Sequence, residues 1–143
     1  MKYSFNIPIK PVAKQSFRAV AVKRGKVHGF TPENITDNKL KIQKHVISQL
    51  PKPYRMLMRE ALITKLYFVF KRPELMARRL EEQYGSNPYI PKTTKPDIDN
   101  LMKQLFDAIK GIVIIDDNII VHINDLGKFY GKEDMIILEI EGQ

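Results

Sequence analysis

The pattern that most constrains the fold is an amphipathic helix in the last third of the chain. Apolar residues recur there at spacings of three and four, the period of a helix with one buried face. A proline stands at position 96, just before this segment, and a glycine at position 111, just after it, as expected at a helix start and end. The spacing predicts a helix between Pro96 and Gly111, with an apolar face made of Ile98, Leu101, Met102, Leu105, Phe106 and Ile109.

The opposite side of the predicted helix carries a polar stripe. At about 100° per residue, this side is shared by Asp99, Asn100, Lys103, Asp107 and Lys110. The buried surface and any chemistry are therefore expected on opposite sides of one helix.

Acidic residues gather around this helix although the chain as a whole is basic. The sequence has 24 Lys and Arg against 16 Asp and Glu. Carboxylates crowded together raise one another's pKa unless a cation neutralises them. Mg²⁺ is held by one or two carboxylates with water and phosphate oxygens. The cluster therefore indicates a metal-dependent site for phosphates, and its members are Asp97, Asp99, Asp107, Asp116 and Asp117.

Simpler roles for the same residues stay open. Asp97 fits the N-cap position, and with Asp99 it would complement the helix dipole, an arrangement worth about 1 kcal/mol. Lys103 stands four residues after Asp99 and would form a solvated ion pair with it. These structural roles compete with metal binding and catalysis.

The run PDIDNLMKQLFDAI, followed by a glycine, a short apolar segment and Asp-Asp, resembles the signature of the RusA family of Holliday junction resolvases. The resemblance implies a small homodimeric endonuclease of DNA recombination and repair that cuts four-way DNA junctions by paired nicks. It implies Mg²⁺ as the cofactor, with Mn²⁺ as a substitute. It also implies that Asp97, Asp99 and Asp117 bind the metal, with Asp116 as a further candidate, and that Lys103 is a catalytic lysine.

Basic residues elsewhere are candidates for DNA contact. A net charge of +8 and a pI near 9.6 indicate a polyanionic partner, although ribosomal and membrane-surface proteins share this feature. The basic loop 10–18, the loop before the acidic site and a late lysine-aromatic stretch supply the candidates, which are Lys14, Arg18, Lys92, Lys95 and Lys128. Solvated turns are the competing interpretation for the loop 10–18 and for a predicted hairpin tip at 23–26.

Several classes of protein are excluded or disfavoured. The absence of cysteine excludes disulfides, thiolate zinc sites and a cysteine nucleophile. The three histidines are scattered without the spacing of metal ligands. No apolar run reaches the length of a membrane span, and the first residues lack the apolar centre of a signal peptide. A cytoplasmic protein without a membrane partner is expected.

The remaining segments predict a single α+β domain over 1–143, with a mixed, mostly antiparallel sheet packed against the site helix. The resemblance leads us to expect Asp117 at the mouth of the strand after the site helix, back beside the helix N-terminus.

The expected strands are 3–9, a hairpin of 17–22 and 27–30, a central strand 61–70, 119–123 and 135–140. The expected helices start at Thr31-Pro32, with an apolar face of Ile35, Ile42, Val46, Ile47 and Leu50, and at Glu74, ending at Tyr84. Loops are expected at 85–96 and 128–132, and 112–115 is a short strand or a buried turn.

Two other functions remain open. A non-catalytic basic module that binds nucleic acid would explain the charge, but it leaves the acidic cluster unexplained. A different Asp-x-Asp enzyme of metal-dependent phosphoryl transfer, such as a nucleotidyltransferase, would need a glycine-rich nucleotide loop that the sequence lacks.

Overall fold

The computed structural model describes residues 1–14, 18–22, 26–30, 33–52, 56–85 and 87–143. Its centre is a five-stranded sheet with the strand order β1-β7-β4-β6-β5. These strands are β1 (Lys2–Ile7), β4 (Ala61–Lys71), β5 (Ile90–Pro91), β6 (Ile120–Gly131) and β7 (Met135–Gly142). The strand β4 lies in the middle of the sheet, as its run of β-branched and aromatic residues predicts.

The sheet is mixed, and most of its pairs are antiparallel. β4 runs parallel to β6, whereas the pairs β1–β7, β4–β7 and β5–β6 are antiparallel. The predicted α+β class with a mostly antiparallel sheet is therefore confirmed.

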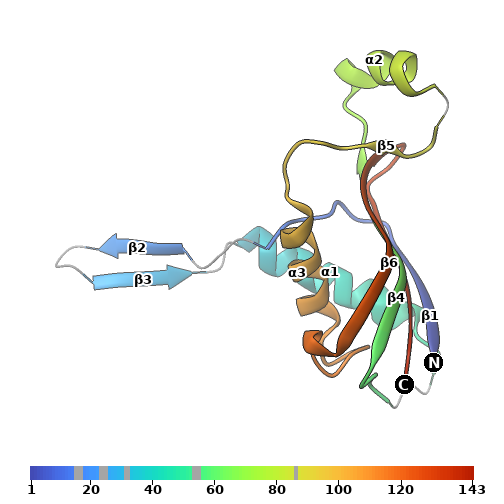
Figure 1. Cartoon of the computed structure of the whole chain (residues 1–143). Helices are drawn as coiled ribbons and strands as arrows, with labels where there is room; N and C mark the ends of the chain where they lie inside the picture. Colours follow the sequence, from blue (N-terminus) through green and yellow to red (C-terminus); the bar gives the residue numbers. More distant parts are fainter. Residues whose placement is uncertain (15–17, 23–25, 31–32, 53–55, 86) are drawn as a thin grey trace.

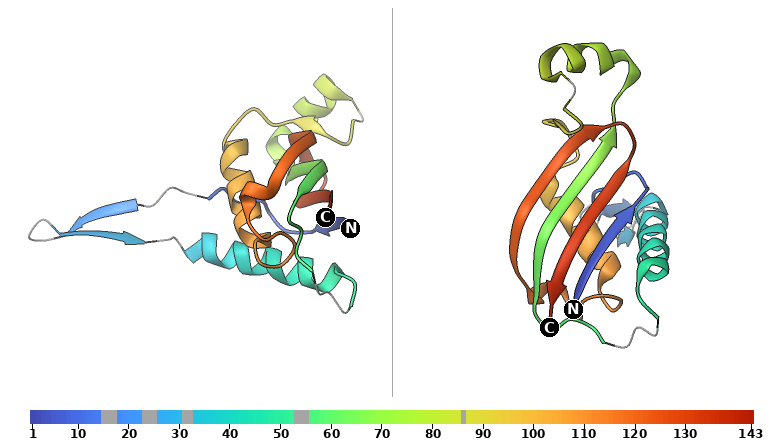
Figure 2. Two further views of the ribbon diagram at one scale, coloured as in Figure 1. Left: turned by 60° about the horizontal axis from the view of Figure 1, so that its bottom comes forward. Right: turned by 90° about the vertical axis from the view of Figure 1, so that its right-hand side faces the viewer.

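Two helices cover one face of the sheet, α1 (Glu33–Gln49) and α3 (Ile98–Ile109), as the face-on view of Figure 2 shows. The apolar side of α3 closes the core: Leu101, Leu105 and Ile109 are fully buried against inward side chains of the strands. A buried polar contact joins the two helices, because the Gln104 amide nitrogen donates to the Ile35 carbonyl (2.8 Å) and to the Asn38 Oδ1 atom (3.2 Å). The predicted site helix between Pro96 and Gly111 is confirmed, and it ends one residue before Lys110.

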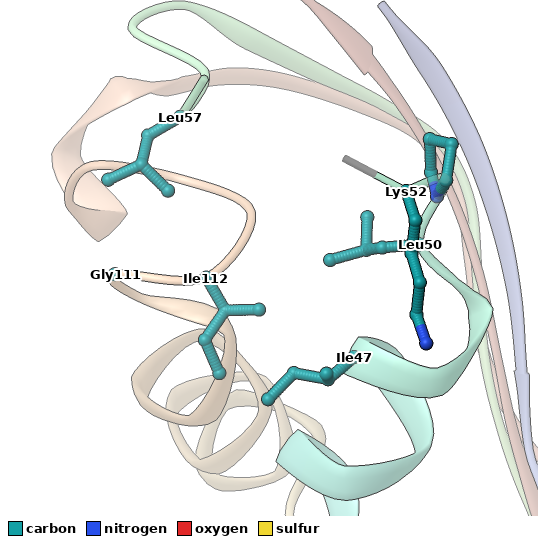
Figure 3. Close-up of a pocket in the computed structure, with 7 residues that line it drawn as sticks. Ile47, Leu50, Lys52, Leu57, Gly111 and Ile112 are labelled. Atoms are coloured by element: carbon teal, nitrogen blue, oxygen red, sulfur yellow. The ribbon is translucent and has the colours of Figure 1, made fainter. Parts of the chain in front are cut away.

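The apolar face predicted for α1 is correct except at its end. Ile35, Ile42 and Val46 are buried, but Ile47 is half exposed. Ile47 borders a pocket of about 430 Å³ between the end of α1 and the turn after α3, beside Leu50 (Figure 3). Its side chain therefore lies at the margin of the core. The predicted cap at Thr31-Pro32 lies outside the described residues.

The strand β6 corrects the expectation of a basic turn at 128–132. Lys128, Phe129 and Tyr130 continue β6, which pairs with β4 as far as Gly131. The turn comes later, between Gly131 and Met135. Local composition indicated a turn, but pairing with β4 on one side and β5 on the other extends the strand.

The hairpin formed by β2 (Arg18–Val22) and β3 (Lys26–Phe30) pairs antiparallel, as predicted. In Figure 1 these two strands extend away from the sheet and its helices. Of the predicted cationic tip at 23–26, residues 23–25 lie outside the described residues, and Lys26 begins β3.

The middle of the chain matches the predictions with small differences. The helix α2 (Glu74–Tyr84) has the predicted bounds and lies beyond the end of β4 in Figure 1. The predicted loop 85–96 contains the two-residue strand β5. The segment 112–115 is a turn with Val113 and Ile114 buried. None of the helices in the described ranges is both long and apolar enough to cross a bilayer.

Candidate metal and nucleic-acid site

The N-terminal end of α3 presents two acidic side chains. Asp97 occupies the N-cap position, and its carbonyl oxygen accepts the first helical hydrogen bond from the Leu101 amide (3.1 Å). Its carboxylate makes no capping hydrogen bond. Asp97 and Asp99 are both exposed, and no hydrogen bond or ion pair joins either carboxylate to another described residue. Asp97 therefore occupies the predicted N-cap position, but its carboxylate is not used as a capping hydrogen-bond acceptor.

Lys103 is exposed one turn further along α3. The predicted ion pair between Lys103 and Asp99 is absent from the part of the chain that the structure describes. The Lys103 ammonium thus remains available for a ligand on the polar side of α3.

The second acidic pair lies at the other end of α3. Lys110, directly after the helix, places its ammonium 2.8 Å from the Asp116 Oδ1 atom, which also accepts from the Asp117 amide (2.8 Å). The hydrogen bond with Lys110 is the main cause that lowers the pKa of Asp116, and the same contact raises the pKa of Lys110. Asp117 is exposed and opens a short 3-10 helix, η1 (Asp117–Ile119).

The length of α3 separates the two acidic pairs within one chain. Twelve helical residues at about 1.5 Å each span roughly 18 Å. Across the described ranges, no three acidic, histidine or cysteine side chains are grouped closely enough to hold a metal ion. Asp117 lies at the mouth of β6, as expected, but it does not join Asp97 and Asp99 in one group, because its neighbour Asp116 is paired with Lys110 at the C-terminal end of α3.

The loop before Asp97 is held by Lys128. The Lys128 ammonium donates to the Thr94 carbonyl (2.6 Å) and to the Pro96 carbonyl (2.7 Å), on either side of the cis Lys95-Pro96 bond. The Lys128 carbonyl also accepts from the Lys92 amide (3.0 Å). Lys128, predicted as a DNA contact, thus directs its half-buried ammonium into the protein and fixes the approach to Asp97.

Lys92 and Tyr130 form a small polar group beside this loop. The Lys92 ammonium donates to the Thr94 hydroxyl (2.6 Å) and the Tyr130 hydroxyl (3.2 Å), and it lies over the Phe70 and Tyr130 rings. The hydrogen bond with Thr94, followed by that with Lys92, lowers the pKa of Tyr130. Lys95 is exposed nearby and has no ion-pair partner in the described ranges.

The basic loop after β1 is tied to the side of α3. The Lys14 amide donates to the Asn100 carbonyl (2.9 Å), and the ammonium groups of Lys14 and Lys39 lie 3.5 Å and 3.3 Å from the Asp107 Oδ2 atom. Asp107 is therefore compensated by protein cations, unlike Asp97 and Asp99. Arg18 belongs to β2, but its side chain lies outside the described part of the structure.

Sequence reasoning missed three residues of this region. Lys39 was not paired with Asp107, because they belong to different helices and no local spacing joins them. Lys10 and Lys71 border the loop before Asp97, where they meet Lys92 and Lys95. Only the sheet topology brings these four lysines together.

The chain is similar to known proteins over most of its length. Residues 8–141 match the family described as Endodeoxyribonuclease RusA. The chain is also similar to an uncharacterized protein of Bacillus subtilis (strain 168), YqaN, with 27% identity over 139 residues, which covers 92% of this chain and 90% of that protein.

Proposed function

The chain belongs to the RusA endodeoxyribonuclease family, and we propose that it resolves four-way DNA junctions by paired, symmetric, Mg²⁺-dependent nicks. Membership implies an endonuclease of the Holliday junction resolvase type, a DNA junction as substrate and dependence on a metal ion. The choice of Mg²⁺, the residues that act and the dimeric state are the finer parts of the proposal.

The observation that carries the proposal is the pair of uncompensated carboxylates at the start of α3. Asp97 and Asp99 are exposed, lie two residues apart and have no cationic partner in the described ranges, within a chain of net charge +8. Carboxylate oxygens are the donors that Mg²⁺ prefers, and one or two suffice when water and phosphate oxygens complete the shell. The donor set therefore fits Mg²⁺, which when bound supplies Lewis acidity toward the scissile phosphate and lowers the pKa of a water.

The chain's own groups would position the DNA and stabilise charge. Lys103 lies on the polar side of α3 with a free ammonium and would stabilise the negative charge that develops on the phosphate. Lys95, directly before the site, would hold the strand to be cut, and Lys128 would fix the backbone that carries Asp97. Because positioning errors of about 1 Å cost up to about 100-fold in rate, this fixation matters for catalysis.

A two-fold dimer supplies the third carboxylate that one chain keeps at a distance. Two copies of α3 running antiparallel across a two-fold axis would set Asp97 and Asp99 of one subunit beside Asp117 of the partner subunit. The same axis creates two equivalent sites, which suits a junction that must be nicked on two opposed strands. The separation of the acidic pairs along α3 supports this arrangement.

The direct test compares acidic variants on junction and duplex DNA. Asp97→Asn, Asp99→Asn and Asp117→Asn should each nearly abolish nicking of a synthetic four-way junction in Mg²⁺ or Mn²⁺. The variants should stay folded and bind the junction at least as tightly in Ca²⁺, because a negative charge near phosphate is removed. Near-native cutting by any variant would remove that residue from the site. If the native protein cut linear duplex as well as it cuts the junction, it would be a general nuclease. If it cut no DNA, it would be a binding module.

Mixing two inactive variants tests whether the site is shared between subunits. If each site takes ligands from both chains, a heterodimer of Asp97→Asn with Asp117→Asn contains one site in which all carboxylates are native. If each site takes its ligands from a single chain, the heterodimer contains no such site. With random pairing, about a quarter of the sites are restored. The restored enzyme should make single nicks. Light scattering confirms the dimer, and a mixture that forms heterodimers yet cuts nothing would refute the shared site.

A further inference from the structure

A basic pocket lies beside the loop that leads to Asp97. It has a volume of about 330 Å³ and opens between the end of β4, the residues after β1 and the loop before α3. Four lysines from these three segments meet there. We call it the lysine pocket, and its lining residues are Lys10, Phe70, Lys71, Pro73, Lys92, Lys95, Pro96, Tyr130 and Asp134.

The charge of the lysine pocket is unbalanced. Among the described residues that line it, Asp134 is the sole acidic one, and the Asp134 Oδ1 atom accepts a hydrogen bond from the Lys71 backbone amide (2.8 Å). In the described ranges, no carboxylate lies within 4.0 Å of the ammonium groups of Lys10, Lys71 or Lys95. Elsewhere the chain does pair its lysines, as Lys14 and Lys39 show with Asp107. The lysine pocket thus concentrates positive charge that the protein leaves unpaired.

One wall of the lysine pocket is rigid and carries further donors. The Lys92 ammonium is fixed by the Thr94 and Tyr130 hydroxyls and lies over the Phe70 ring. The hydrogen bond with Thr94, and after it the hydrogen bond with Lys92, lowers the pKa of Tyr130, so its hydroxyl belongs to the same hydrogen-bonded group. A preorganised cation beside lysines without carboxylate partners in the described ranges is an arrangement suited to an anionic group with several oxygens.

We propose that the lysine pocket binds one backbone phosphate of the DNA, within three nucleotides of the phosphate that is cut. This inference rests on the proposed function and adds Lys10 and Lys71 to the DNA-binding surface. Lys95 lines the pocket and lies two residues before Asp97, so their Cα atoms are within about 7.6 Å. Each strand carries a phosphate every 3.4 Å or so along the axis. The bound phosphate is therefore one to three nucleotides from the scissile one.

The first test measures binding without cleavage. Junction affinity is determined in Ca²⁺ across a salt series for the native protein, for the double variant Lys10→Gln/Lys71→Gln, and for Lys44→Gln, an exposed lysine of α1. One lost phosphate contact lowers the salt slope by about 0.9, which corresponds to roughly eightfold weaker binding at 0.1 M salt. Lys10→Arg/Lys71→Arg should keep native affinity. Thermal unfolding verifies that all variants are folded.

A second test locates the phosphate on the DNA. Single phosphates around the nick are replaced one at a time by neutral methylphosphonates, and affinity is measured again. One position within three nucleotides of the nick should weaken binding by the native protein and have no added effect on the double variant, because the two changes remove the same contact. Free inorganic phosphate at millimolar concentration serves as the competitor that detects a small-anion site instead.

The outcomes separate this inference from the proposed function. Failure of the native protein to bind or cut junctions would overturn both. Native cutting, together with equal affinity and salt slope for the double variant and Lys44→Gln, would overturn the lysine pocket alone. The lysine pocket would also be overturned if every methylphosphonate weakened binding by the double variant as much as binding by the native protein. It would likewise be overturned if free phosphate competed with the junction but no single methylphosphonate weakened binding.

Discussion

The substitution Lys128→Met distinguishes a positioning lysine from a DNA contact. It keeps the length of the side chain but removes the ammonium that donates to the Thr94 and Pro96 carbonyls at 2.6 Å and 2.7 Å. A hydrogen bond to a charged group contributes about 1.5–3 kcal/mol when buried. Lys128 is only half buried, so water can hydrate the freed carbonyls, and we expect the pair to contribute about 1–2 kcal/mol.

These energies give measurable changes in stability and rate. For a chain of this size, 1 kcal/mol shifts the melting temperature by about 3 °C, so Lys128→Met should melt about 3–6 °C lower. The freed loop carries Asp97, and its displacement should slow junction cutting by up to about 100-fold. Junction affinity in Ca²⁺ and its salt dependence should change little, because the Lys128 ammonium faces the protein.

Calorimetry, single-turnover cutting and a salt series measure these effects, with Lys44→Met as the matched control. A direct DNA contact would give the opposite pattern. Affinity would then fall and the salt slope would drop by about one unit, while the melting temperature stayed native. That result would refute the positioning role of Lys128.

Three further predictions concern other residues. Lys103→Ala should slow cutting by about 100-fold or more at unchanged melting temperature, since the side chain is exposed and leaves no cavity; a lower melting temperature with native activity would make Lys103 structural. The hydrogen bond with Asp125 raises the pKa of Tyr67 to about 12, so an ultraviolet titration should show Asp125→Asn returning one tyrosine toward the ordinary value of about 10. Gln104→Met should cost about 1–2 kcal/mol of stability by chemical denaturation, through the lost contacts with α1, and should leave junction affinity native.

The helices show how far periodicity predicts this fold. Helix α3 has the expected bounds because its apolar spacing and its flanking proline and glycine agree, and α2 likewise begins and ends where predicted. Strand β6 was predicted too short because Lys128 and two glycines resemble turn chemistry, whereas strand pairing with distant residues decides its length. Sequence patterns are local, and this pairing is not.

The candidate site was also predictable from the sequence only in part. The acids at the start of α3 and Lys103 were identified from a local motif, and the structure leaves them exposed and available. The place of Asp117 depended on the path of the chain after α3, which the tight turn at Ile109 determines. The lysine pocket depends on three segments far apart in the sequence, so no local signal announced Lys10 or Lys71.

The strand order has a consequence for synthesis on the ribosome. The strand β7 is made after the other four strands of the sheet, yet it lies between β1 and β4. While β7 is still unmade, β1 has no partner in the sheet and one edge of β4 is bare. Helices and the β2–β3 hairpin can form early because their contacts are local, and β4 can pair with β6 once β6 has been made. The nascent chain therefore leaves β1 unpaired and one edge of β4 exposed until β7 has been made, and such unpaired strand edges are prone to aggregation.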